Sequence, residues 1–273
     1  MIVSRFAPSP TGHLHLGHAY SALFAYDAAR QTGGRFLLRI EDIDPVRCKP
    51  EFTEAIFEDL RWLGLTWEEP VRRQSQHMDD YAAALARLRG LGVLYPCFCT
   101  RREIAEEAAA AGHAPHDMGE VVYPGTCRHV SADKRAAKLA EHPAANWRLD
   151  VATALAMTGP LGWLDLARGE IAAKPADFGD VVLARKDVPT SYHLSVTVDD
   201  HLQGVTLVTR AEDLFRATDI QRLLQALLGY AVPDYHHHPL QTDAQGRRYA
   251  KRDKAVTLRA LRAAGQTAQD VRA

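Results

Sequence analysis

The sequence predicts an α/β fold in which a doubly wound parallel sheet is interrupted by an inserted α+β subdomain. The first forty residues follow the pattern strand, loop, helix, strand, and a further strand and helix occupy residues 204–228. Between them, the character changes to short strands, a Gly/Pro/His-containing loop and three of the four cysteines. We therefore expect a Rossmann-like domain split over residues 1–93 and 187–245, an insertion over 94–186, and a tail over 246–273.

The N-terminal unit begins with a strand at residues 2–7, followed by a turn-rich stretch at residues 8–12. Apolar residues between 16 and 24 recur at helical spacing, and the pair Gly33-Gly34 ends this helix in the usual C-terminal manner. Residues 36–40 form a nearly continuous apolar run, typical of a strand buried in a parallel sheet. This βαβ unit places its loop at the carboxyl end of the first strand, where ligands bind in doubly wound sheets.

The remaining elements follow from shorter patterns. We expect amphipathic helices around residues 52–60 and 78–88, an Ala/Glu-rich helix at 104–111, short strands of the insertion at 146–151 and 163–167, a strand at 204–209, and a helix at 219–228. Thr218 or Asp219 would cap the last of these helices. The tail from Val256 is expected to be helical at first and then polar.

The overall charge limits the ways in which this chain could bind nucleic acid. The net charge is −1 and the pI is near 6.9, so the surface is not uniformly basic. Contact with RNA would depend on local patches, because a few well-placed Lys and Arg suffice to neutralise phosphates. Candidate patches are Arg72-Arg73, Arg101-Arg102 and residues 247–254, each of which could equally be a solvated face.

The start of the chain lacks a signal peptide, and no apolar run approaches the roughly 18 residues that span a bilayer. We therefore expect a cytoplasmic protein that contacts no membrane. In that reducing compartment the four cysteines are expected to be thiols or metal ligands. Cys48 has no partner nearby in the sequence and is expected to be an ordinary buried thiol.

The loop and helix after the first strand contain two histidines that suit a phosphate. His15 and His18 are three residues apart in the first helical turn and so share one face. A helix N-terminus already attracts anions, and imidazole donors there can bind phosphate oxygens. Gly17 has no side chain where a nucleotide would approach the backbone. The alternative is a capped surface helix with incidental histidines.

This segment resembles the class I aminoacyl-tRNA synthetases, and within them the glutamyl branch. His15-Leu16-Gly17-His18 matches their His-Ile-Gly-His signature with one apolar exchange, and residues 5–12 match the glutamyl opening. The resemblance implies a class I catalytic core that binds ATP with Mg²⁺ and activates L-glutamate as an acyl-adenylate, with His15 and His18 as catalytic residues. The α-carboxyl is already an anion at pH 7, so this chemistry needs no general base.

A second family motif, Lys-Met-Ser-Lys-Ser, has a weaker counterpart near the C-terminus. Lys251 falls on the second lysine, which implies an ATP-phosphate contact in catalysis, whereas Arg248 replaces the first lysine and Ala250 the serine. Without the resemblance, this segment would be taken for a solvated basic loop. The run 236–238 consists of three histidines, which we expect to be a loop lining the site, because consecutive residues rarely converge on one metal ion.

Glutamate requires cations for its γ-carboxylate and an anion for its ammonium group. Arg5 and Arg210 lie near the carboxyl ends of expected strands, and arginine binds a carboxylate in two places. Tyr192 can add a hydroxyl, and Glu41 would bind the ammonium group. The resemblance implies that these four positions form the amino-acid pocket, which rejects glutamine. The loop residues Phe6, Ala7, Pro8 and Ser9 complete the expected pocket. Any one of the charged residues could instead belong to a surface ion pair.

Three cysteines form a candidate metal site in the insertion. Cys97 and Cys99 share one face of an extended segment, and with Cys127 they offer three soft ligands to a tetrahedral Zn²⁺. Chemistry alone favours His129 as the fourth ligand. A Cys-x-Cys, Tyr, Cys set in a short glutamyl-type paralogue favours Tyr123. Such a zinc, one per chain, would be structural; the alternative is three buried thiols.

The size and the cysteine set resemble the short glutamyl-queuosine tRNA(Asp) synthetase branch of this family, because no anticodon-reading helical domain follows the expected catalytic half. This resemblance implies a monomer that activates glutamate without tRNA and transfers it to queuosine in the anticodon loop of tRNA(Asp), which the insertion would contact. The alternatives are a truncated glutamyl-tRNA synthetase that charges a tRNA 3′ end, a nucleotidyltransferase with a small-molecule product, and an inactive zinc-stapled RNA-binding module.

Overall fold

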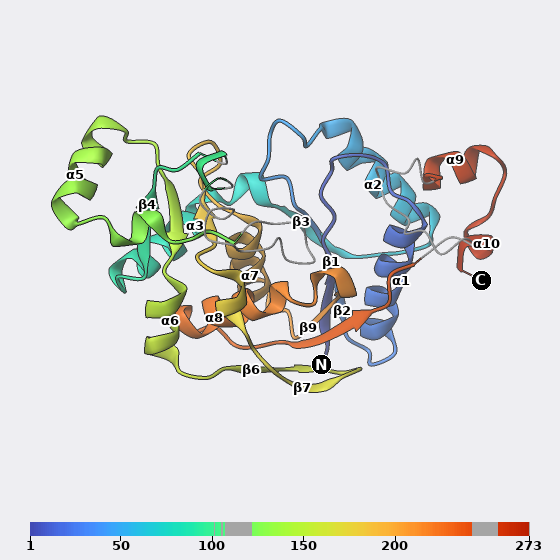
Figure 1. The fold of residues 1–273 in the computed structure, drawn as a ribbon. Coiled ribbons are helices and arrows are strands. Elements are labelled where there is room, and N and C mark those ends of the chain that lie inside the picture. Colours follow the sequence, from blue (N-terminus) through green and yellow to red (C-terminus); the bar gives the residue numbers. More distant parts are fainter. Residues whose placement is uncertain (101, 105, 107–121, 242–255, 273) are drawn as a thin grey trace.

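The computed structural model describes residues 1–100, 102–104, 106, 122–241 and 256–272. Figure 1 shows an elongated arrangement with parallel strands and their helices in the middle. An antiparallel unit with helix α5 lies at one end, and helices α9 and α10 lie at the other. No helix among the described residues is long and apolar enough to cross a membrane.

The predicted βαβ unit is confirmed. Strands β1 (Val3–Phe6) and β2 (Arg35–Ile40) are parallel, and helix α1 (Leu16–Arg30) connects them. β2 also pairs in parallel with β3 (Glu68–Arg73), which follows α2 (Pro50–Trp62). The helix-ending glycine pair has a steric reason as well, because a side chain on its second member would collide with the carbonyl oxygen ahead of β1.

The second half of the sheet consists of β9 (Leu207–Ala211) and β10 (Asp234–His238), again parallel. It joins the first half beside β1, where the backbone N–H of Thr206 donates to the carbonyl of Val3 at 3.0 Å. The Val3 N–H in turn donates to the Thr206 hydroxyl at 2.9 Å. The doubly wound architecture predicted from the sequence is therefore present.

Two helices of this half lie between strands, and the sequence predicts only the second of them. Helix α7 (Tyr192–Leu202) precedes β9, and α8 (Ala217–Leu228) follows it. The predicted cap of α8 is wrong: Arg216 occupies the N-cap position without a side-chain bond. Thr218 is the second residue of the helix, and its hydroxyl accepts a hydrogen bond from Arg210 instead.

One short strand belongs to a different sheet from the one predicted. β6 (Gly162–Asp165) pairs in parallel with β10 and antiparallel with β7 (Gly169–Ala172), so it extends the main sheet and not the insertion. The buried Trp163 ring packs against Tyr235 of β10, with ring centroids 5.2 Å apart. A short apolar pattern shows that a strand exists but not which sheet it joins.

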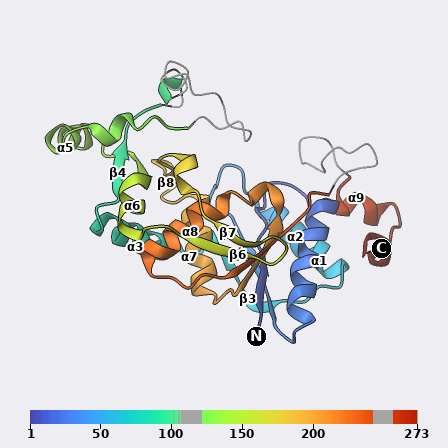
Figure 2. The ribbon, with the colours of Figure 1, turned by 60° about the horizontal axis from the view of Figure 1, so that its bottom comes forward.

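The insertion has the α+β character that the sequence predicts. It is built on an antiparallel sheet of β4 (Leu94–Cys97), β5 (Asn146–Leu149) and β8 (Val182–Ala184), with α5 (Ala132–Glu141) at its outer end (Figure 2). Most of the helix expected at 104–111 lies outside the described residues. Further helices with bounds in the described part of the chain include α3 (Met78–Gly90), α6 (Val151–Thr158), α9 (Leu258–Ala263) and α10 (Ala268–Arg272). The 3-10 turns there include η1 (Gln74–Gln76), η2 (Thr126–His129), η3 (Pro175–Phe178) and η4 (Glu212–Leu214).

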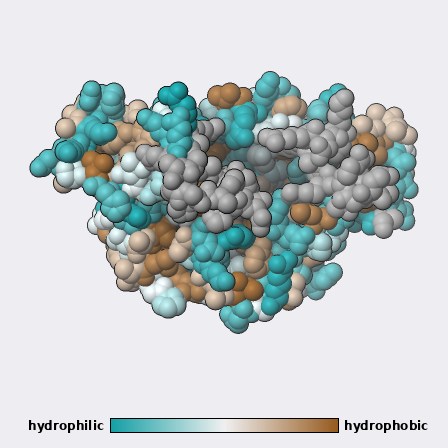
Figure 3. Space-filling model, in the orientation of Figure 1, coloured by the Kyte–Doolittle hydropathy of each residue, from teal (hydrophilic) through white to brown (hydrophobic). Residues whose placement is uncertain are grey.

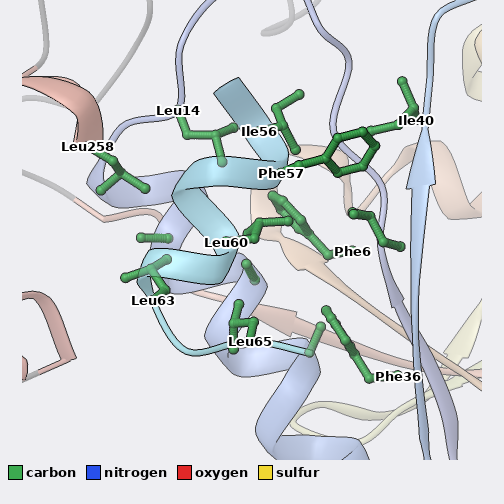
Figure 4. Packing of buried hydrophobic residues seen from close by; sticks show 14 of the residues in the cluster. Phe6, Leu14, Phe36, Ile40, Ile56, Phe57, Leu60, Leu63, Leu65 and Leu258 are labelled. Carbon is green, nitrogen blue, oxygen red and sulfur yellow. The ribbon is translucent and has the colours of Figure 1, made fainter. Parts of the chain in front are cut away.

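A hydrophobic cluster ties the C-terminal segment to the first loop. Figure 4 shows side chains of α2 packed against β1 and β2, with Leu14 and Leu258 together at the edge of the cluster. Both leucines are almost completely buried, and the N–H of Leu258 donates to the carbonyl of Leu14 at 2.8 Å. On the surface seen in Figure 3, hydrophobic side chains form small groups separated by hydrophilic ones. The core therefore places the start of α9 beside the loop that carries the histidines.

Candidate active site

A cavity of about 640 Å³ opens at the carboxyl ends of β1 and β9. Its walls come from the loop after β1, the start of α1, the end of β2, the start of α7 and the ends of β9 and β10. The structure brings together on this cavity all the residues predicted to bind glutamate and the described residues predicted to bind ATP. These residues are Arg5, Phe6, Ala7, Pro8, Ser9, Glu41, Tyr192 and Arg210, with His15, Gly17 and His18.

The two signature histidines cap helix α1. His15 is the N-cap itself, and its Nδ1 accepts from the N–H of Gly17 at 3.2 Å. The Nδ1 of His18 accepts from the N–H of His15 at 3.2 Å, and the ring centroids are 3.7 Å apart. The capped-helix alternative therefore describes the backbone correctly, but both rings also line the cavity. Because capping uses Nδ1, the Nε2 atom of each ring lies outside these two hydrogen bonds.

The second predicted motif lies outside the described residues, and with it Arg248, Ala250 and Lys251. The described residues on both sides of that segment are at the site. Gln241 lines the cavity, and Thr257 forms an isolated antiparallel bridge with His15. The described residues that flank the motif on either side therefore lie at the cavity and at the histidine loop.

Arg210 is a buried cation with neutral partners. Its Nε donates to Nε2 of His237 at 3.1 Å, and its two terminal nitrogens donate to the Tyr192 hydroxyl at 3.2 Å and the Thr218 hydroxyl at 2.6 Å. Its exposed fraction is 6%, and no carboxylate in the described part of the chain forms an ion pair with it. A buried guanidinium without a counter-charge suits a carboxylate ligand.

Arg5 is equally buried but already has a counter-charge. Its Nε lies 3.0 Å from Oδ1 of Asp200, and the same oxygen accepts from Arg39 at 2.8 Å. Burial alone would raise the pKa of Asp200, but Arg5 and Arg39 together lower it. The two cavity arginines therefore differ in their electrostatic state, a difference that the sequence-based prediction does not contain.

Glu41 lies at the end of β2 and lines the cavity. Its Oε1 is 3.2 Å from Arg39, which is completely buried and also 3.6 Å from Asp199. Burial raises the pKa of Glu41, whereas Arg39 and Arg5 oppose this rise. Arg39, Asp199 and Asp200 were missed by the sequence-based prediction. A signal existed: an arginine inside an apolar strand needs an anion, and two adjacent aspartates directly follow the uncharged stretch 194–198.

The run 236–238 is not the predicted loop but most of strand β10. His236 and His238 point to one side, where both rings contact Phe24, and His238 lines the cavity. His237 points to the other side, with its Nδ1 at 2.7 Å from Asp165. Alternation on a strand explains the separation, but three polar residues in a row hide the strand from a hydropathy pattern.

The cysteine cluster has a geometry that fits a metal ion. The three Sγ atoms of Cys97, Cys99 and Cys127 lie within 4.8 Å of one another. The Tyr123 hydroxyl lies 3.5 Å from Sγ of Cys99 and accepts from the N–H of Cys127 at 2.8 Å, while His129 is exposed and outside the cluster. A hydrogen bond from Cys97 lowers the pKa of the Cys127 thiol to about 4. The position of the tyrosine favours it as the fourth ligand.

Cys48 differs from its prediction as a buried thiol. It is only half-buried, lines the cavity, and donates to the carbonyl of Glu41 at 3.8 Å. Burial raises the pKa of this thiol.

The fold is a parallel α/β sheet with a cavity at the carboxyl ends of its strands, and the comparisons identify the class of the protein. Residues 1–270 match the family of the class I tRNA synthetases (E and Q), catalytic domain, and the chain belongs to this family. It is therefore a ligase of the aminoacyl-tRNA synthetase type. The resemblance stated from the opening motif is confirmed.

Among its relatives is the Glutamyl-Q tRNA(Asp) synthetase of Rhodobacter capsulatus, 50% identical over 99% of this chain and 98% of that protein. The Glutamate–tRNA ligase of Aquifex aeolicus is 40% identical over 97% of this chain but only 54% of its own length. A crystal structure of a glutamate tRNA ligase from Elizabethkingia meningosepticum in complex with its amino acid superposes with a TM-score of 0.77 at 29% identity, covering 92% of this chain and 52% of that one.

Proposed function

We propose that this enzyme activates L-glutamate with ATP in the absence of tRNA and then transfers the glutamyl group to queuosine in the anticodon loop of tRNA(Asp). The observation that carries the proposal is the cavity of about 640 Å³ that contains both an uncompensated buried guanidinium and the imidazole-capped start of α1. The first feature suits the side chain of glutamate, and the second suits the phosphates of ATP. The names of its relatives support the acceptor.

In the activation step, an oxygen of the α-carboxylate attacks the α-phosphorus of ATP, and the bond to pyrophosphate breaks with its electron pair on the leaving group. His15 and His18 would donate to phosphate oxygens as their charge grows, assisted by the positive end of α1. Lys251 would stabilise the departing pyrophosphate, for which Mg²⁺ is the accompanying ion. The reaction depends on alignment and electrostatics, because the nucleophile is already ionised.

In the amino-acid pocket, Arg210 and Tyr192 would bind the γ-carboxylate, and Glu41 would bind the ammonium group. Arg5 is assigned a supporting role, because Asp200 already matches its charge. In the transfer step, a hydroxyl of queuosine attacks the glutamyl carbonyl, and AMP leaves from the adenylate. The ester that forms joins glutamate to the modified base.

The insertion is assigned to RNA contact and to one structural zinc. Cys97, Cys99, Cys127 and Tyr123 are the proposed ligands, supported by their mutual distances. Zinc bound there would connect β4 to η2, next to the buried side chains of Tyr95 and Tyr123. We further propose that the enzyme acts as a monomer in the cytoplasm.

The proposal is tested by incubating the purified enzyme with labelled glutamate, ATP and total tRNA from cells that do or do not make queuosine. Label should enter tRNA only from queuosine-producing cells, while glutamate-dependent ATP–pyrophosphate exchange should proceed without any tRNA. Equal labelling of both tRNA pools would contradict the proposed acceptor.

The second candidate is charging of a tRNA 3′ end, which the Aquifex aeolicus relative favours by its name. Periodate distinguishes the two acceptors when the 3′ terminus is first protected or removed. Loss of acceptance after oxidation of the queuosine diol alone supports the modified base, whereas unchanged acceptance by tRNA without queuosine supports the 3′ end.

A further inference from the structure

Behind Arg210, three adjacent parallel strands each contribute one polar residue to a hydrogen-bonded row. In the sheet register His237 of β10 is opposite Arg210 of β9, and Asp165 ends β6 on the other side of β10. Asp165 is fully buried, and the exposed fractions of His237 and Arg210 are 3% and 6%. Nδ1 of the imidazole is 2.7 Å from the carboxylate, and its Nε2 is 3.1 Å from Nε of the arginine.

The hydrogen bonds determine which nitrogen of His237 carries the proton. Asp165 accepts hydrogen bonds from the backbone N–H groups of Ala167 and Arg168 at 3.0 and 3.1 Å, and these donors stabilise its ionised carboxylate. Although burial raises its pKa, the hydrogen bond from His237 contributes to a net lowering. An ionised carboxylate accepts only, so Nδ1 must donate to it. An arginine donates only, so Nε2 must accept.

The imidazole in this chain is neutral near physiological pH. Burial, and next the charge of Arg210, lower the pKa of His237 to about 4. The Thr218 hydroxyl, 3.4 Å from Nε2, lies on the same side as the arginine and can donate to the same lone pair. The ring of His237, itself fixed by Asp165, therefore orients the guanidinium of Arg210 without carrying a charge.

The two cavity arginines differ in whether the partner of their Nε atom is charged or neutral. The Nε atom of Arg5 is fixed directly by a carboxylate, Asp200, which also cancels the charge of the guanidinium. The Nε atom of Arg210 is fixed by an imidazole, and the nearest carboxylate on that side is one ring further away. If Asp165 paired directly with Arg210, the cavity would lose its uncompensated cation.

We propose that His237 is a positioning residue that acts as a neutral spacer: it orients Arg210 while separating it from the charge of Asp165, so that the cavity keeps a cation for the anionic side chain of its amino acid. This inference rests on the proposed function and deepens it. It makes selection of glutamate over glutamine depend on a residue that lies behind the pocket and does not contact the substrate. An amide side chain cannot supply the missing counter-charge.

His237→Gln and His237→Leu test the spacer. Glutamine can accept from Arg210 with Oε1 and donate to Asp165 with its amide nitrogen, whereas leucine can do neither. His236→Leu is the matched control, because its ring lies on the opposite side of β10 against Phe24. Glutamate-dependent ATP–pyrophosphate exchange, without tRNA, gives KM for glutamate, KM for ATP, and the glutamate-to-glutamine ratio of kcat/KM.

His237→Leu should raise KM for glutamate on the order of ten- to one-hundredfold, as expected for the loss of a hydrogen bond from a charged donor. KM for ATP should stay unchanged, and His237→Gln should restore KM for glutamate to within about threefold of wild type. These KM values, and the glutamate-to-glutamine ratio of kcat/KM, do not depend on the fraction of enzyme that is folded. An unchanged KM for glutamate in His237→Leu, or an equal loss in both variants, overturns the spacer role while the proposed function stands. A wild-type enzyme without glutamate-dependent exchange overturns the proposed function itself.

Discussion

Replacing Arg210 by methionine removes the buried cation but keeps a long, flexible side chain. The partners of its guanidinium are the neutral groups of Tyr192, Thr218 and His237. Within the described residues, the variant therefore leaves no buried carboxylate without its counter-charge. Breaking a buried ion pair would destabilise the fold, but this substitution breaks none, so we expect a folded enzyme with a defective pocket.

The size of the defect follows from the burial of the side chain. Arg210 is 6% exposed, so bulk water screens its attraction for a carboxylate only weakly. Two unit charges about 4 Å apart attract by about 4 kcal/mol at an effective dielectric constant of about 20. We expect kcat/KM for glutamate to fall on the order of 10²- to 10³-fold, and KM for ATP to stay the same. The kcat/KM for glutamine should change much less, because the glutamine amide carries no charge.

ATP–pyrophosphate exchange at varied glutamate, glutamine and ATP measures all three quantities. Arg168→Met is the matched control, because that arginine pairs with Glu212 at 3.1 Å, is 43% exposed, and does not line the cavity. The control should retain wild-type kinetics. The reasoning is refuted if Arg210→Met keeps its KM for glutamate within about threefold of wild type. It is also refuted if the substitution raises KM for ATP as much as KM for glutamate.

Three further predictions concern the metal, the pH dependence and the helix start. Cys127→Ser should lower the zinc content from about one per chain to background by atomic absorption, while Cys48→Ser should not; equal zinc in both variants would exclude the cluster. The pKa of about 4 for folded His237 lies below its ordinary value of 6.5, so the unfolded chain binds the proton first on acidification. The free energy of unfolding should therefore fall by about 2 kcal/mol from this residue between pH 7 and pH 5, and denaturant titrations of His237→Gln should show a shallower fall. His18→Gln keeps a capping acceptor at its position but removes the imidazole, so kcat for exchange should drop on the order of 10²-fold with an unchanged melting temperature; a kcat like that of wild type would assign His18 to capping alone.

The elements near the N-terminus could be predicted because their signals are local. Periodicity, a turn-rich loop and a glycine pair place β1, α1 and β2 within a few residues. The strand β6 shows the limit of such signals. Its existence is visible in the pattern, but its partner β10 lies about seventy residues later, and only packing of Trp163 against Tyr235 decides the sheet.

The same limit applies to charge in the active site. The sequence places Arg5 and Arg210 at strand ends and predicts that both face one cavity, as the structure shows. It does not reveal that one of them is already neutralised, because Asp200 reaches Arg5 across 195 residues.

The difference between these two arginines separates stability from recognition. Arg5 belongs to a buried network in which Asp200 also binds Arg39, so its charge contributes chiefly to the packing of β1 and β2 against α7. Arg210 is surrounded by neutral acceptors, and its charge is matched only when an anion enters the cavity. A sheet that aligned a carboxylate directly beside Arg210 would gain an ion pair and lose its selectivity. The imidazole of His237 avoids that outcome, because it satisfies the hydrogen-bond geometry of the guanidinium without cancelling its charge.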